Sequence, residues 1–142
     1  MKLDDELDII TEMKEYMADA ENCLESAVYL IDGGFYKDSL NRSYYCVFNS
    51  MCACLLAIGF TDYRKHSGVI SKFRELLIKP NIFPSVLSKI IGKLEEYRNN
   101  SDYQKGFRAS KGDAEECADK AKLFFETTKK YIDGWLEENN GG

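Results

Sequence analysis

The sequence contains the stretch Asn41-Arg42-Ser43-Tyr44-Tyr45-Cys46-Val47-Phe48 in the middle of a helical pattern. Around it, apolar residues recur every three or four positions, which is the spacing of one face of an α-helix. They are Leu40, Tyr44, Val47, Phe48, Met51, Leu55 and Ile58. This pattern predicts a helix from about Asp38 to Ile58, which Gly59 would end. Arg42 stands beside the apolar stripe, where a charged side chain needs a partner.

A second helical pattern precedes this stretch. Apolar residues recur there every seven positions up to a strong stop signal, Asp32-Gly33-Gly34. They are Leu3, Ile10, Met17, Leu24 and Ile31. A seven-residue spacing also fits a coiled coil, but Lys14 and Glu21 occupy positions where the partner helix would need apolar residues. We therefore predict one long core helix.

Downstream of the central stretch, the pattern predicts three more helices. One runs from about Ser67 to Ile78 and is followed by a proline loop over residues 79–84. The next begins with Ser85 as its cap, carries apolar residues up to Tyr97 and has Arg98 near its end. After a polar loop over 104–112, Asp113 and Glu116 have the spacing of a capping box that opens the last helix.

Composition places the chain among compact helical proteins. Its 142 residues include 44% hydrophobic and 13% aromatic residues, enough to bury a core. No segment alternates with a period of two, so we predict an all-α, up-and-down bundle of about five helices. We expect one domain over residues 1–136 and a frayed tail over 137–142. There is no apolar run of about 18 residues and no basic, apolar leader, so we expect a cytoplasmic protein without a membrane span.

Charge and cysteine content narrow the functional classes. The net charge is -5, whereas dedicated nucleic-acid binders carry a basic excess that neutralises phosphates. This balance argues against tight nonspecific binding but leaves room for a small cationic site. Five cysteines and a single histidine offer few ligands for a metal, so we predict buried thiols, no metal site and no cofactor.

A third polar stretch, Arg98-Asn99-Asn100-Ser101-Asp102-Tyr103, carries the best candidate site. The Arg98 guanidinium could hold a phosphate through two parallel hydrogen bonds. On spacing alone we favour a plainer interpretation, in which Arg98 and Asp102 form a salt bridge four residues apart on a helix.

Other candidates are weaker when each is taken alone. His66, within Lys65-His66-Ser67-Gly68-Val69-Ile70, would suit a general base at neutral pH, although a lone histidine at a helix start is more often structural. Tyrosines can stack on bases, but they more commonly pack in a helical core. We favour packing for Tyr44 and leave the roles of Arg42 and Tyr45 open.

Taken together, the three stretches resemble HEPN domains (named for higher eukaryotes and prokaryotes nucleotide-binding), most closely the stand-alone prokaryotic type. The matches are N-R-x-Y-Y-x-x-F over residues 41–48 and R-x-x-x-D-Y over 98–103. Residues 65–70 match the polar-to-apolar run of a K-x-H-S-G-V-I-like stretch. The resemblance covers about residues 15–135. It implies a helical bundle with an added helix, often in a symmetric dimer.

The resemblance also implies a range of functions. Many HEPN proteins are metal-independent ribonucleases that act as toxins in defence systems, and others are partners of a small nucleotidyltransferase. In the ribonucleases, an arginine followed a few residues later by a histidine forms the active motif at the dimer cleft. Arg98 and Asn99 fit its beginning, but Tyr103 occupies the histidine position. A tyrosine with a pKa of about 10 is a poor general base at neutral pH.

We therefore favour a nucleotide- or RNA-associated module that forms a homodimer and pairs with a nucleotidyltransferase in a toxin–antitoxin or defence system. Its polar cleft would contain Arg98, Asn99, Asp102, Tyr103 and His66, with Arg42 and Tyr45 as further members. Two alternatives remain: a metal-independent endoribonuclease that uses His66 or Tyr103 beside Arg98, and a protein-interaction domain whose polar residues only lock helices together.

Overall fold

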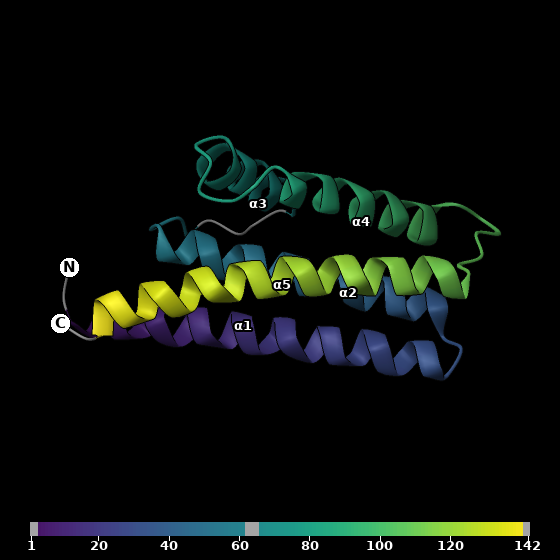
Figure 1. Ribbon diagram of the computed structural model, residues 1–142, viewed down its shortest axis with the longest axis horizontal. Coiled ribbons are helices and arrows are strands. Elements are labelled where there is room, and N and C mark those ends of the chain that lie inside the picture. Colours follow the sequence, from purple (N-terminus) through teal and green to yellow (C-terminus); the bar gives the residue numbers. More distant parts are fainter. Residues whose placement is uncertain (1–2, 62–65, 141–142) are drawn as a thin grey trace.

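The computed structural model describes residues 3–61 and 66–140, and within them the side chains of residues 6–61 and 68–139. The described chain forms the predicted all-α, up-and-down bundle (Figure 1). Its elements are α1 (Leu3–Asp32), α2 (Tyr36–Ala57), α3 (His66–Phe73), the π-helical turn η1 (Arg74–Ile78), α4 (Val86–Tyr103) and α5 (Lys111–Asn140). The long helices α1, α2 and α5 lie side by side, and α4 lies on the far side of this layer from α1 (Figure 1).

Glycine ends both of the first two helices, as the sequence predicts. After α1, the Gly34 N–H donates to Ile31 O at 3.0 Å and the Phe35 N–H donates to Leu30 O at 2.8 Å. Gly34 has a φ of +82°, in the left-handed region that a glycine adopts without steric cost. The Gly59 turn repeats this pair of hydrogen bonds at the end of α2. Such Schellman turns satisfy the last carbonyls of a helix and fix the direction in which the chain leaves it.

Helix α2 lies at the centre of the bundle, in contact with α1, α3, α4 and α5. Its later half is buried almost without interruption from Ser50 to Leu56. All five cysteines are free and buried, which confirms the predicted core thiols. Burial raises the pKa of the Cys52 thiol to about 12, so this thiol stays protonated in the core.

One face of α2 stays partly open. Helix α5 contacts both α1 and α4 and so closes the bundle along one side of α2. Along another stripe of the same helix, the partly exposed side chains recur at helical spacing, which defines the open face of α2. Its residues are Asn41, Arg42, Tyr45, Phe48 and Asn49.

The structure corrects several local predictions. The Ser85 side chain makes no capping hydrogen bond at the start of α4. The capping box of α5 is formed by Ser110 and Asp113, not by Asp113 and Glu116: the Asp113 N–H donates to Ser110 Oγ at 3.0 Å, and the Ser110 N–H donates to Asp113 Oδ2 at 3.1 Å. Because Ser110 caps the helix, α5 begins before Gly112, which the sequence had placed in a loop.

Helix α4 ends at Tyr103, so the whole Arg98–Tyr103 stretch is helical, as predicted. The end of the last helix differs from expectation. Helix α5 continues to Asn140, although we predicted fraying from residue 137. None of the helices in the described part of the chain has the length and apolar character needed to cross a membrane.

Candidate functional site

Arg98 of α4 and three side chains of α2 form a cluster of arginine and tyrosine side chains. The Arg98 guanidinium carbon lies over the Tyr44 ring, 4.8 Å from its centroid, and 6.0 Å from the centroid of the Tyr45 ring. The Arg42 guanidinium carbon also lies over the Tyr45 ring, 5.4 Å from its centroid. We call these four residues the Arg–Tyr cluster. It brings together two positive charges that a bundle core does not require.

Tyr44 anchors this cluster to the core. It is 2% exposed, which confirms the predicted packing role. Its ring meets the Tyr45 ring edge-on at 5.3 Å between centroids and stacks on Phe48 at 6.4 Å. Burial raises the pKa of the Tyr44 hydroxyl, and the positive charge of Arg98 opposes this shift. Tyr44 is therefore a neutral platform on which a guanidinium rests.

The predicted Arg98–Asp102 pair is present. Arg98 Nε and Asp102 Oδ2 are 3.6 Å apart, one helical turn from each other. This distance is longer than a hydrogen bond, and the buried Nε atom has no hydrogen-bond partner. The Arg98 side chain is 21% exposed. The guanidinium thus lies between a carboxylate and an aromatic face, while part of it reaches solvent.

Arg42 is held from two directions. Its Nη2 atom donates to Asn41 Oδ1 at 2.7 Å, and its Nη1 atom donates to Cys23 Sγ of α1 at 3.8 Å. Asn49 Nδ2 also contacts this sulfur, at 3.9 Å. Burial raises the pKa of the Cys23 thiol, and the charge of Arg42 opposes the shift. Sequence reasoning missed Cys23 and Asn49, although Asn49 follows Arg42 by seven residues and so shares its helix face.

The remaining predicted site residues are not joined to this cluster by any contact between described side chains. Tyr103 is 75% exposed in the last turn of α4, and Asn99 is exposed on the same helix. His66 begins α3, but its side chain lies outside those that the structure describes. The proximity of His66 to Arg98 therefore stays a prediction.

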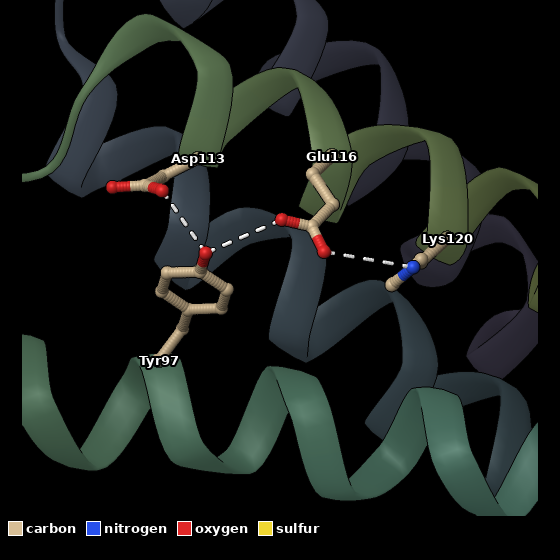
Figure 2. Close-up of polar contacts among 4 residues, drawn as sticks. All are labelled: Tyr97, Asp113, Glu116 and Lys120. Carbon is tan, nitrogen blue, oxygen red and sulfur yellow. Dashed lines mark hydrogen bonds and ion pairs between the residues drawn. The ribbon is translucent and has the colours of Figure 1, made fainter.

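A second polar network fixes the part of α4 that carries Arg98 (Figure 2). Tyr97 Oη lies 3.0 Å from Asp113 Oδ1 and 3.3 Å from Glu116 Oε2, both on α5. Glu116 Oε1 in turn pairs with Lys120 Nζ at 3.7 Å. Burial, followed by the hydrogen bond to Asp113, raises the pKa of the Tyr97 hydroxyl, so it remains a donor. Sequence reasoning missed this network because its members come from two different helices.

The chemistry available at the Arg–Tyr cluster is anion binding and stacking. A guanidinium can hold a phosphate with two parallel hydrogen bonds, and a tyrosine face can stack on a base. Within the described residues, no group of three histidine, cysteine, aspartate or glutamate side chains could hold a metal ion.

Comparison with known proteins identifies the family. A profile of the HEPN domain matches residues 13–131, most of the chain. The chain belongs to the HEPN family. The crystal structure of an archaeal HEPN homologue superposes with a TM-score of 0.63 at 23% identity, over 84% of this chain and 97% of the other. At that identity the likeness shows the HEPN fold alone.

Two relatives come from Methanocaldococcus jannaschii, and both are named as candidate toxins. One is 32% identical over 85% of this chain and 82% of its own length. The other is 29% identical over 88% of this chain and 92% of its own length. These relatives are thus similar to this chain over most of both lengths.

Proposed function

We propose that this HEPN protein associates with a nucleotide or RNA and acts as the toxin-like member of a toxin–antitoxin or defence pair. The observation that carries the RNA part is the Arg–Tyr cluster, in which the guanidinium groups of Arg42 and Arg98 both lie near the Tyr45 ring. The toxin part is supported by the two relatives named as candidate toxins. We further propose a cytoplasmic location and a nucleotidyltransferase as the protein partner.

In this proposal Arg98 holds a phosphate. Its partly exposed guanidinium is preoriented by the Tyr44 ring and by Asp102, so little rotamer freedom is lost when a phosphate binds. Asp102 orients Arg98, and exposed Tyr103 and Asn99 contact the sugar or the base. Arg42 and Tyr45 extend the site along the open face of α2. The protein works as a homodimer in which this face borders the cleft.

The alternative function is a metal-independent endoribonuclease that uses Arg98 with His66 or Tyr103. The exposure of Tyr103 favours this alternative, because its phenol is open to solvent on the helix that carries Arg98. A neutral phenol can orient a ribose hydroxyl or donate to a leaving oxygen, although it is a weak base at neutral pH. The interaction-domain hypothesis instead expects the Arg–Tyr cluster to serve packing alone.

One experiment separates these functions. End-labelled RNA of mixed sequence is incubated, in a chelator, with purified wild type, Arg98→Ala and the matched control Lys130→Ala, which removes an exposed charge on α5. The RNA-associated module predicts that wild type and Lys130→Ala retard the RNA in a native gel without cleaving it, and that Arg98→Ala does not. Cleavage that is lost only in Arg98→Ala would establish the endoribonuclease.

If the wild type neither retards nor cleaves the RNA, the proposal is overturned and the interaction-domain hypothesis remains. The partner is tested separately, by coexpression with the nucleotidyltransferase encoded beside this gene. Failure of the two chains to copurify, or the absence of such a neighbouring gene, would refute that part.

A further inference from the structure

A hollow of about 550 Å³ lies between α1 and α5. The later half of α1 runs beside the first half of α5, on the side of the bundle away from α4 (Figure 1). Buried alanines allow the two helices to approach each other there: Ala27 of α1, and Ala114 and Ala118 of α5. The resulting groove is separate from the Arg–Tyr cluster, which lies between α2 and α4.

Large apolar side chains line this groove without being buried. Leu24 and Val28 form part of its wall, and Tyr29 is 78% exposed beside them. A neighbouring hollow shares Tyr29 and Asp32 and adds Phe35, which is 58% exposed. Exposed aromatic residues of this kind are the usual anchors of protein interfaces.

The Phe35 ring lies against the end of α1. Its backbone N–H donates to Leu30 O in the turn that ends the helix, and a Cβ placed on Gly33 would meet a Phe35 ring carbon at 3.0 Å. The ring therefore packs over Gly33 while most of its surface stays open to a partner.

The rim of the groove is acidic. Glu25, Asp32 and Asp119 line it with a single cation, Lys122. Lys122 already pairs with Glu126 at 4.0 Å, whereas no ion pair between described residues involves the three carboxylates. This negative charge disfavours a second copy of the chain as the molecule bound in the groove, because a symmetric contact would place the same carboxylates against each other.

We propose that the α1–α5 groove docks a basic amphipathic helix of a protein partner. The apolar side of that helix lies on Val28, Tyr29 and Phe35, and its lysines or arginines face Glu25, Asp32 and Asp119. A helix laid into a groove between two helices is a common mode of peptide recognition. The inference rests on the proposed function only in that a protein partner exists, and it needs no RNA site.

The test uses the full chain and a synthetic helical peptide of leucine and lysine with one apolar and one basic side. A peptide of the same pattern with glutamate in place of lysine serves as the probe control. Backbone amide shifts locate the peptide, and fluorescence of a dye on the peptide gives the Kd at about 0.15 M salt, where long-range attraction is screened. The proposal predicts shifts along residues 24–35 and 115–122, and no binding of the glutamate peptide.

Matched variants separate groove binding from general attraction to an acidic protein. Tyr29→Ala leaves the charge unchanged and should weaken binding about tenfold, as expected for an exposed aromatic anchor. Ile82→Ala, at an exposed apolar residue between η1 and α4, should leave Kd unchanged. Asp119→Lys should also weaken binding about tenfold, whereas Glu96→Lys on α4 should weaken it far less.

Three results would overturn the proposal: an unchanged Kd in Tyr29→Ala, equal losses in Asp119→Lys and Glu96→Lys, or self-association of the wild type that Tyr29→Ala abolishes. Circular dichroism confirms that each variant is folded. Arg98→Ala provides the link to the proposed function. It should bind the peptide like wild type, so the failure of RNA binding and the failure of this groove are distinguishable.

Discussion

Replacing Tyr97 by phenylalanine removes one hydroxyl from the network that joins α4 to α5 (Figure 2). The hydroxyl has a single proton, and its 3.0 Å distance to Asp113 Oδ1 is shorter than its 3.3 Å distance to Glu116 Oε2. A hydrogen bond to a charged acceptor contributes about 1.5–3 kcal/mol. Asp113 and Glu116 are partly exposed, so water replaces the lost hydroxyl in the variant. We therefore expect the free energy of unfolding to fall by the lower end of this range, about 1.5 kcal/mol. For a chain of this size, the melting temperature should fall by roughly 5 °C.

The assay is urea denaturation followed by helical circular dichroism, with a double-mutant cycle. Tyr97→Phe, Asp113→Ala and the double variant give the coupling free energy between the two side chains, which we expect to be about 1 kcal/mol. The same cycle with Glu116→Ala should give a smaller coupling, because its contact is longer. Tyr29→Phe, which removes the hydroxyl of an exposed tyrosine, is the control and should change stability by less than about 0.5 kcal/mol. A Tyr97–Asp113 coupling of zero within error would refute the reasoning.

Three further predictions concern the turns, the thiols and the cap. Gly34→Ala should lower the free energy of unfolding in urea by about 1 kcal/mol. Its φ of +82° strains any side chain, although no atom lies within 4 Å of the added Cβ. Gly134→Ala, at an exposed position inside α5, should instead raise the free energy of unfolding by up to about 1 kcal/mol. Ellman's reagent should label no cysteine rapidly in the native protein and all five in denaturant, and fast native labelling would contradict the buried core thiols. The hydrogen bond from the Ser110 N–H lowers the pKa of Asp113 in the folded protein. The Asp113 carboxylate therefore stabilises the fold above its unfolded pKa, and this stabilisation is lost as the pH falls through its lower folded pKa. Unfolding free energy should therefore fall more steeply below about pH 4 in wild type than in Asp113→Asn, and parallel curves would argue against this.

The fold follows from the sequence because its signals are local and repeated. The apolar spacing around Tyr44 and the glycines after α1 and α2 each specify a helix or its end with no knowledge of the rest of the chain. HEPN membership was likewise predictable, because three short stretches occur in order over most of the chain. Helix ends were harder to predict. The α5 cap depends on the reciprocal bonds of Ser110 and Asp113, and Gly112 between them gave the opposite signal.

The site was predictable only in part. Arg98 and Asp102 are one turn apart on one helix, so their pairing follows from spacing. Stacking of Arg98 on Tyr44 depends on how α4 crosses α2, which no local pattern encodes. The same holds for Cys23, which reaches Arg42 from another helix. The acidic rim of the α1–α5 groove also joins residues far apart in sequence, so it appears only in the folded chain.

The central claim is that Arg98 holds a phosphate of RNA. The most direct test is a fluorescence anisotropy titration of a dye-labelled single-stranded RNA of mixed sequence with wild type, Arg98→Ala, Arg98→Lys and Lys130→Ala. Loss of one charge-assisted, two-pronged contact should raise Kd about tenfold or more in Arg98→Ala. Arg98→Lys keeps the charge but loses the two-pronged guanidinium contact, so its Kd should lie between those of the wild type and Arg98→Ala. The Kd of Lys130→Ala should equal that of the wild type. An Arg98→Ala variant that is folded and binds RNA with the Kd of the wild type would contradict the account.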